Sequence, residues 1–218
     1  NTFYGGAFAI RLLGESTAKP CKGNKINNNK IYGILSNFTG STGVINGISI
    51  SGGTTNNIYN NLIGNLTAPA ANVAAAISGI TLGGGTTNNI YYNSINLPSL
   101  TSTGALFGSS ALYASSTTTL NLRNNIFSNK GGGKALFTYN SANLSCDYNM
   151  LYTTGTALTQ RISPIAANYA TLDAWKTASS LDANSIVYNP ATVAVVVAKA
   201  GTMRPAFNLT LIHSIYSN

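Results

Sequence analysis

The sequence predicts an all-β solenoid, a coil whose similar turns, or rungs, stack along one axis. The segment Thr86–Leu97 repeats Thr54–Asn65 at an offset of 32 residues. The same offset aligns three columns of matching residues: Ile26, Ile58, Ile90 and Leu122; Asn29, Asn61, Asn93 and Asn125; Ile31, Ile63, Ile95 and Phe127. Self-similarity over a few tens of residues, in β-favouring sequence, is typical of a repeat architecture.

Each rung is predicted to hold three short strands, which in one rung lie near residues 45–50, 56–60 and 62–66. These runs alternate apolar residues with small or polar ones and end in glycine, serine or threonine. That is the period-two pattern of strands bounded by turns. Glycines at 52–53 and 83–85 make a helix through these segments unfavourable.

A fifth rung follows at a shorter spacing. The segment Cys146–Leu151 matches Leu122–Phe127 at an offset of 24 residues instead of 32. We assign the eight missing residues to a surface loop, which earlier rungs carry at Leu35–Val44, Thr67–Ala76 and Ser99–Gly108, because loops absorb insertions more readily than packed strands. The bare rung is therefore 24 residues long.

The asparagine column continues at Asn149 in the fifth rung. Asparagine tolerates the left-handed backbone conformation that a tight bend between two strands requires. Its amide both donates and accepts, so stacked asparagines can bridge successive rungs. We predict a structural ladder at this bend, formed by Asn29, Asn61, Asn93, Asn125 and Asn149.

The rung length, the three strands, the asparagine bend and the loop after the third strand resemble the right-handed parallel β-helix of the pectin-lyase-like superfamily. The tail segments Tyr169–Trp175, Leu181–Ile186 and Asn189-Pro190 are similar to the closing segment of secreted β-helix proteins exported by the type IX route. The resemblance implies about five to six rungs, an extracellular or cell-surface location and the secretion machinery as a partner during export. The superfamily includes lyases, hydrolases and non-catalytic proteins, so the resemblance does not fix an activity.

We divide the chain into β-helix rungs over 1–153 and a C-terminal capping region over 154–218. Ile10-Arg11-Leu12 stands where Ile48-Ser49-Ile50 stands later, so the first rung begins before residue 14. The cap is predicted to contain one short helix, N-capped by Thr171, with Trp175 packed onto the coil. A solenoid needs such a cover over its last rung.

Composition excludes several classes of function. Of 218 residues only 7% are charged, and the net charge is +8. The basic residues are scattered except for Lys19, Lys22, Lys25 and Lys30, so we expect a solvated basic edge and no nucleic-acid partner. The most apolar run, 191–198, is far too short to span a membrane. No signal-peptide segment is recognisable, and we expect a mature product or a piece of a larger exported protein.

The two cysteines are predicted to be unpaired. Cys146 takes the inward position of the Ile58 column, whereas Cys21 belongs to the first rung. Four rungs of about 4.8 Å separate them by roughly 19 Å. A disulfide requires Cα atoms within roughly 7 Å.

The carboxylates do not form a catalytic group in the sequence. Glu15, Asp147, Asp173 and Asp182 are the only four, and no two occupy matching positions of neighbouring rungs. Glycoside hydrolysis and acidic calcium sites both need carboxylates close together. His213 is isolated. We therefore assign no catalytic residue, metal or other cofactor, while a metal-free lyase based on Lys or Tyr stays open.

A binding surface has better support. If Ile48 and Leu112 point into the coil, the residues that follow them in each first strand point outward. These form a row that is our candidate glycan site: Arg11, Ser49, Thr81, Tyr113 and Phe137. A second outward row, on the second strands, contains Tyr59, Tyr91, Arg123 and Asp147. The alternative is that tyrosines simply favour strand surfaces and stack on one another.

Threonines also form rows: Thr54, Thr86 and Thr118; Thr55, Thr87 and Thr119. Such hydroxyl arrays suggest an ice-binding solenoid, although threonine also serves as a turn residue at a glycine-rich corner. Our main prediction is a non-catalytic secreted or cell-surface domain, part of a larger exported protein. It would act as a rigid adhesive element that contacts a polysaccharide or a cell-surface glycan. The alternatives are a polysaccharide lyase or glycoside hydrolase of this fold, and an ice-binding protein.

Overall fold

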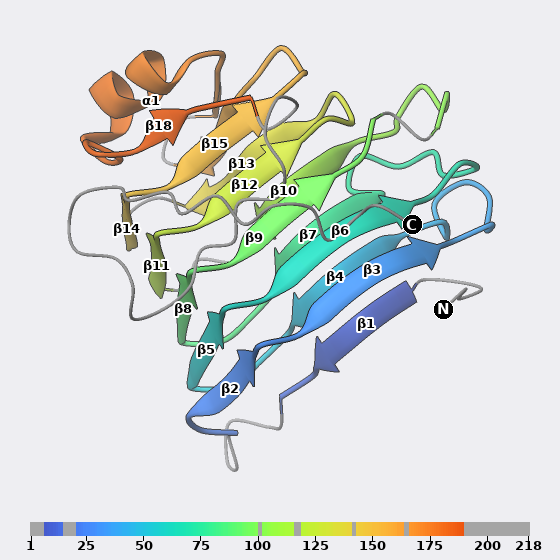
Figure 1. Ribbon diagram of the computed structural model, residues 1–218, viewed down its shortest axis with the longest axis horizontal. Coiled ribbons are helices and arrows are strands. Elements are labelled where there is room, and N and C mark those ends of the chain that lie inside the picture. Colours follow the sequence, from blue (N-terminus) through green and yellow to red (C-terminus); the bar gives the residue numbers. More distant parts are fainter. Residues whose placement is uncertain are drawn as a thin grey trace, which may run out of the picture.

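Three β-sheets run along a coil of stacked rungs, and each turn of the chain adds one strand to each sheet (Figure 1). The computed structural model describes residues 7–14, 21–99, 102–115, 119–140, 143–163 and 166–189. Within these residues the chain forms a parallel β-helix, as the repeat predicted. Five complete rungs are followed by a partial sixth.

The strands are grouped here by sheet. The first sheet contains β1 (Ala7–Leu12), β4 (Ile45–Ile50), β7 (Ile77–Leu82), β10 (Ser109–Ala114), β13 (Lys134–Asn140), β16 (Thr159–Ser163) and β17 (Ala167–Tyr169). The second contains β2 (Asn24–Asn27), β5 (Thr55–Tyr59), β8 (Thr87–Tyr91), β11 (Thr119–Arg123) and β14 (Leu144–Asp147). The third contains β3 (Lys30–Leu35), β6 (Leu62–Thr67), β9 (Ser94–Leu97), β12 (Ile126–Asn129), β15 (Met150–Thr153) and β18 (Ile186–Val187).

The observed register confirms the columns and both spacings. Ile58 pairs with Ile90, and Ile90 with Leu122, at the offset of 32. Leu122 then pairs with Cys146 at the offset of 24. All strand pairs are parallel except β16 with β17, which is antiparallel. The strands near 45–50, 56–60 and 62–66 are β4, β5 and β6.

Inward isoleucines and leucines fill the coil. Ile48, Ile58 and Ile63 come from the three strands of one rung, and all are fully buried. Burial of a side chain of this size contributes roughly 1.5–3 kcal/mol. Most of these inward side chains are β-branched, so the residues that form the core also favour an extended backbone.

The loops between third and first strands also stack on one another. Gly40 forms a parallel bridge with Ala71. The Gly40 N–H donates to Ala70 O at 3.1 Å, and the Asn72 N–H donates to Gly40 O at 2.9 Å. The insertion that lengthens a rung from 24 to 32 residues therefore continues the rung-on-rung hydrogen bonding outside the coil.

The bend that follows each second strand differs from the prediction in one respect. The left-handed residue is not the ladder asparagine but the residue before it: Asn28, Asn60, Tyr92, Asn124 and Tyr148, with φ between 55° and 57°. The ladder asparagines are not among the residues with positive φ, and from Asn61 to Asn149 they are buried in the coil. The prediction assigned both tasks to one residue, and the structure divides them between two.

The predicted amide ladder itself is confirmed. The Nδ2 of each ladder asparagine donates to Oδ1 of the next: 2.9 Å from Asn29 to Asn61, 2.9 Å from Asn61 to Asn93, 3.1 Å from Asn93 to Asn125 and 3.0 Å from Asn125 to Asn149. The same Oδ1 also accepts the backbone N–H of the preceding ladder asparagine, as in Asn61 N to Asn93 Oδ1 at 3.1 Å.

The C-terminal end of the coil is covered by α1 (Leu172–Ser179). Thr171 is its N-cap and accepts the Ala174 N–H at 3.2 Å, as predicted. Trp175 is fully buried, and its ring meets Tyr169 edge-on at 5.3 Å. Strand β16 pairs in parallel with β13, so the first sheet continues beyond residue 153 before the chain turns into the cap.

Cys21 and Cys146 are both free, as predicted from their columns. Within the described part of the chain no helix is long and apolar enough to cross a bilayer.

Candidate functional site

The candidate glycan row lies on the outer face of the first sheet, and its members are paired rung to rung. Arg11 pairs with Ser49, Ser49 with Thr81, Thr81 with Tyr113, and Tyr113 with Phe137. Gln160 of β16, which sequence reasoning missed, extends the row by one rung. It was missed because the predicted boundary at residue 153 assigned β16 to the cap, whereas β16 continues the first sheet.

The two aromatic side chains of the row stack on each other. The ring centroids of Tyr113 and Phe137 are 4.4 Å apart, and their planes differ by 14°. Both side chains are half-buried. Parallel strand pairing places the two rings one rung apart, so they form a rigid apolar platform on the surface.

The row becomes less accessible toward its middle. Ser49 is only 6% exposed, and the Thr81 hydroxyl donates a hydrogen bond to Asn46 Oδ1. At the first rung Arg11 is exposed, and its guanidinium lies 4.7 Å from the centre of the Phe8 ring. The parts of the row that a ligand can reach are therefore the aromatic platform and the Arg11 end.

A lysine lies on the same strand as the platform. Lys134 begins β13, pairs with Ser110 and is half-buried. Burial lowers its pKa, because removing water disfavours the ammonium form. Sequence reasoning did not select Lys134, since its column holds Ser78 and Ser110 in the earlier rungs.

The second outward row is also in register, on the second sheet. Tyr59 pairs with Tyr91, Tyr91 with Arg123, and Arg123 with Asp147. Burial raises the pKa of Tyr91, and the Arg123 charge opposes that shift. The Tyr91 hydroxyl donates to Asn89 Oδ1 at 3.3 Å.

Two further asparagine ladders were not anticipated. One lies inside the coil, where Asn24 Nδ2 donates to Asn56 Oδ1 at 2.9 Å and Asn56 Nδ2 to Asn88 Oδ1 at 2.8 Å. The other lies outside, where Asn89 Nδ2 donates to Asn57 Oδ1 at 2.9 Å. The doubled asparagines of each Thr-Thr-Asn-Asn segment carried this signal, because strand alternation sends one inward and one outward.

The carboxylates of Asp147 and Asp182 attach the cap to the coil. Asp147 accepts the Asn184 N–H at 2.8 Å and the Asn184 Nδ2 at 2.9 Å. Asp182 is 1% exposed and accepts the Trp175 Nε1–H at 2.7 Å and the Ser185 hydroxyl. Both groups thus have structural partners.

Ser185 also continues the ladder at its last rung. The Asn149 N–H donates to Ser185 Oγ at 2.8 Å, in the place where another ladder asparagine would accept. Beside it, burial and the neighbouring Asp182 raise the pKa of the Cys146 thiol well above its usual range. The described residues include no group of three or more His, Cys, Asp or Glu side chains placed to hold a metal ion. Glu15 and His213 lie outside the described residues.

The threonine rows are partly described. Thr55 pairs with Thr87, and Thr87 with Thr119, on the second sheet. Thr118 lies outside the described residues, so the row through Thr54 and Thr86 is seen over two rungs only.

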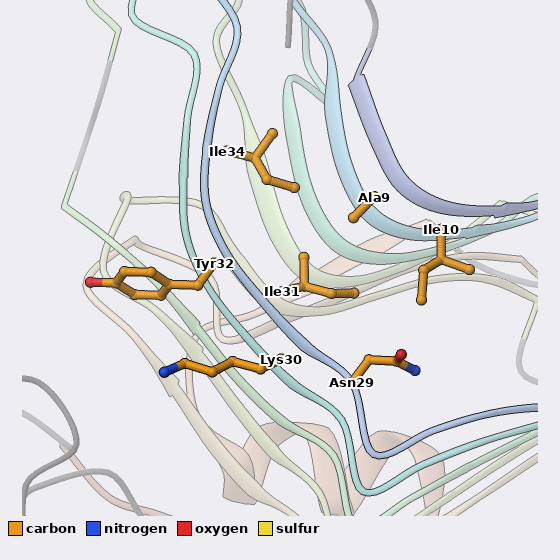
Figure 2. A pocket seen from close by; sticks show the side chains of 7 residues that line it. All are labelled: Ala9, Ile10, Asn29, Lys30, Ile31, Tyr32 and Ile34. Atoms are coloured by element: carbon orange, nitrogen blue, oxygen red, sulfur yellow. The ribbon is translucent and has the colours of Figure 1, made fainter. Parts of the chain in front are cut away.

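Among the hollows on the surface of the described residues, three bear on the argument. At the first rung, a hollow of about 270 Å³ is lined by inward side chains such as Ile10, Ile31 and Ile34, while Lys30 and Tyr32 point away from it (Figure 2). A second, about 610 Å³, lies between β15, β18 and the start of α1. The third, about 270 Å³, lies over the third sheet.

Comparison with protein-family models, with curated proteins and with solved structures finds no match for the chain.

Proposed function

We propose that this chain is a non-catalytic β-helix domain that acts as a rigid glycan-contacting element. The observation that supports this function best is the stacked pair Tyr113 and Phe137 on the outer face of the first sheet. The negative face of an aromatic ring attracts the partly positive C–H groups on one face of a sugar ring. Strand pairing fixes this platform before the ligand arrives, so little entropy is lost on binding.

The surroundings of the platform suit a polymer that runs along the coil axis. Arg11 is exposed at one end of the same row, and Gln160 is partly exposed at the other. Successive rungs would meet successive parts of the chain. The cap-bound carboxylates Asp147 and Asp182 favour binding over hydrolysis, because each already has a structural partner.

We also propose that the domain works outside the cell or at its surface, within a larger exported protein of the pectin-lyase-like superfamily. The support is the 24-residue rung, the asparagine ladder and the resemblance of the tail to that of proteins secreted by the type IX route.

A glycan array tests the site with Tyr113→Ala, Phe137→Ala and the double variant. We expect each single variant to weaken binding at least about tenfold, which is about 1.4 kcal/mol. Tyr59→Ala, on the second sheet, is the matched control and should bind normally. Binding that survives the double variant, or that is lost in Tyr59→Ala, would show that this row is not the site.

The rival function is a carbohydrate-active enzyme. Incubation with acidic polysaccharides, followed by the ultraviolet absorbance of unsaturated products, tests for a lyase. Sustained product formation would contradict the non-catalytic assignment whether or not the chain also binds glycans.

A further inference from the structure

The third hollow lies on a face of the coil that the glycan row does not touch. It is formed over the third sheet by Tyr32, Gly64, Asn65, Asn96 and Pro98, together with the adjoining Leu62 and Ile63. Tyr32, Gly64 and Asn96 are successive members of one outward column, since Tyr32 pairs with Gly64 and Gly64 with Asn96. Three neighbouring rungs thus supply a wall, a floor and a far rim.

The wall is the aromatic ring of Tyr32. Its side chain is 45% exposed and points away from the coil (Figure 2). The floor is Gly64, where a Cβ atom would lie 3.6 Å from Tyr32 Cδ2 and 3.3 Å from Asn96 O. The space beside the ring therefore exists because position 64 has no side chain. The corresponding residues of the other rungs, Asn96 and Ser128, do have one.

Two amides face this space from the rim. Asn96 accepts the Ser128 hydroxyl at 3.1 Å through Oδ1, which fixes the amide and leaves its Nδ2 without a hydrogen bond among the described residues. Asn65 is exposed, and its side chain makes no hydrogen bond among them. Its backbone is left-handed, with φ 49°, as is Gly33 one rung earlier with φ 70°. This left-handed residue interrupts the strand alternation, so the exposed Asn65 directly follows the outward Gly64 and lies beside the hollow.

We propose that this hollow is a separate binding site for one neutral pyranose ring. An exposed aromatic face, a floor without a side chain and two amides at the rim match the two sides of a sugar. The apolar C–H face packs on Tyr32, and vicinal hydroxyls pair with the amides of Asn65 and Asn96. The volume of about 270 Å³ lies near the lower end of ligand pockets, which begin at roughly 300 Å³, and suits a single ring rather than a chain.

The site is independent of the proposed function, because it shares no residue with the first-sheet row. A single ring held by one aromatic face and two amides should bind weakly. At roughly 0.3 kcal/mol per heavy atom the dissociation constant falls in the millimolar range. This affinity becomes useful when a polymer engages both faces of the coil, or when copies of the domain act together.

Two-dimensional amide NMR of the whole chain tests the proposal. The probes are the methyl glycosides of glucose, galactose, mannose and xylose, each titrated to tens of millimolar. We expect at least one sugar to shift the amide signals of Gly64, Asn65 and Asn96 with a saturable dependence on concentration. No saturable shift with any of the four sugars would overturn the proposal.

Two variants locate the binding. Tyr32→Ala should weaken it at least about tenfold, whereas Tyr188→Ala, which removes a tyrosine of similar exposure (42%) near the cap, should leave it unchanged. Gly64→Val should block the hollow while the chain keeps its circular dichroism spectrum, because a β-branched residue suits a strand. Unchanged affinity in Tyr32→Ala or in folded Gly64→Val would contradict the site. Loss of sugar binding in Tyr113→Ala would show that the sugar binds to the first-sheet row instead.

Discussion

Asn93 and Asn121 have the same side chain and different surroundings. Asn93 is fully buried: its Nδ2 donates to Ile58 O at 2.8 Å and to Tyr91 O at 3.1 Å, besides Asn125. Its Oδ1 accepts from the N–H and the Nδ2 of Asn61. Asn121 is half-buried and donates to Asn89 Oδ1 on the outer face. The ladder through Asn93 therefore ties three successive rungs together through backbone and side-chain groups, whereas the outer ladder through Asn121 joins neighbouring side chains.

We predict that Asn93→Ala destabilises the fold by about 3–5 kcal/mol, since it leaves several buried donors and acceptors without partners. Asn121→Ala, the matched change on the outer ladder, should cost about 1 kcal/mol or less, because water can replace the lost partner. Urea unfolding of both variants measures the difference. Equal costs would mean that burial does not distinguish the two ladders.

The residue before each ladder asparagine carries the backbone strain of the bend. Asn occupies this left-handed position in three rungs, and tyrosine occupies it at Tyr92 and Tyr148. A tyrosine in this conformation is strained by roughly 1–2 kcal/mol, whereas asparagine tolerates it. We predict that Tyr92→Asn stabilises the chain by about 0.5–1 kcal/mol, measured as a higher urea midpoint with an unchanged slope. Tyr91→Asn, one residue earlier in the strand, is the control and should not stabilise.

At the scale of elements, the cap is attached by hydrogen bonds that depend on charge. Partial burial would raise the pKa of Asp147, but hydrogen bonds from the Asn184 side chain and backbone and from the Tyr148 N–H, with the Arg123 charge, lower it overall. A carboxyl whose pKa is lower in the folded state stabilises the fold above the unfolded value and loses that contribution as the pH falls through the folded one.

We therefore predict that Asp147→Asn destabilises the cap at neutral pH and that the difference from the native chain shrinks as the pH falls below 3.8, the ordinary Asp value. Fluorescence of Trp175, the only tryptophan, reports the cap during urea unfolding at each pH. Asp173→Asn, in the first turn of α1, controls for the general effect of removing one negative charge. A difference that does not change with pH would contradict this account of Asp147.

The elements themselves were largely predictable because each strand repeats its own pattern in the next rung. Ile58, Ile90 and Leu122 identify a column without knowledge of any contact, and Thr171 identifies a helix start from local chemistry alone. The roles of Asp182 and Ser185 could not be predicted in this way. They occur once, after the repeat has ended, and they meet Asn149 only through the fold of the cap.

The prediction of binding surfaces is limited in the same way, because it relies on what the rungs share. The register of Tyr113 with Phe137 followed from the repeat, but the hollow beside Tyr32 did not. It depends on Gly64, which has no side chain where Tyr32 and Asn96 in the neighbouring rungs have large ones, and on the left-handed backbone that exposes Asn65 beside it. A repeat sequence predicts what its rungs share, whereas a local binding site on a solenoid arises where one rung differs from its neighbours.

At the scale of the whole molecule, the described strands of each rung pair with those of the neighbouring rungs, so stability should follow whole repeats. Deleting residues 80–111 joins Gly79 to Leu112 and puts Leu112 in the place of Ile80. The hybrid strand keeps its inward and outward alternation against β4 and β13. We predict a folded chain with the same type of circular dichroism spectrum and a smaller urea slope, because less surface is exposed on unfolding.

Deleting residues 80–110 instead removes one residue fewer and is the matched control. Ala111 then takes the inward place of Ile80, and Leu112 moves to the outward place of Thr81. A one-residue slip exchanges the two faces of a strand, so the core loses a large side chain while the surface gains one. This variant should be less stable than the longer deletion by several kcal/mol, or should aggregate. If the two deletions were equally stable, the register of the rungs would not be what holds the coil together.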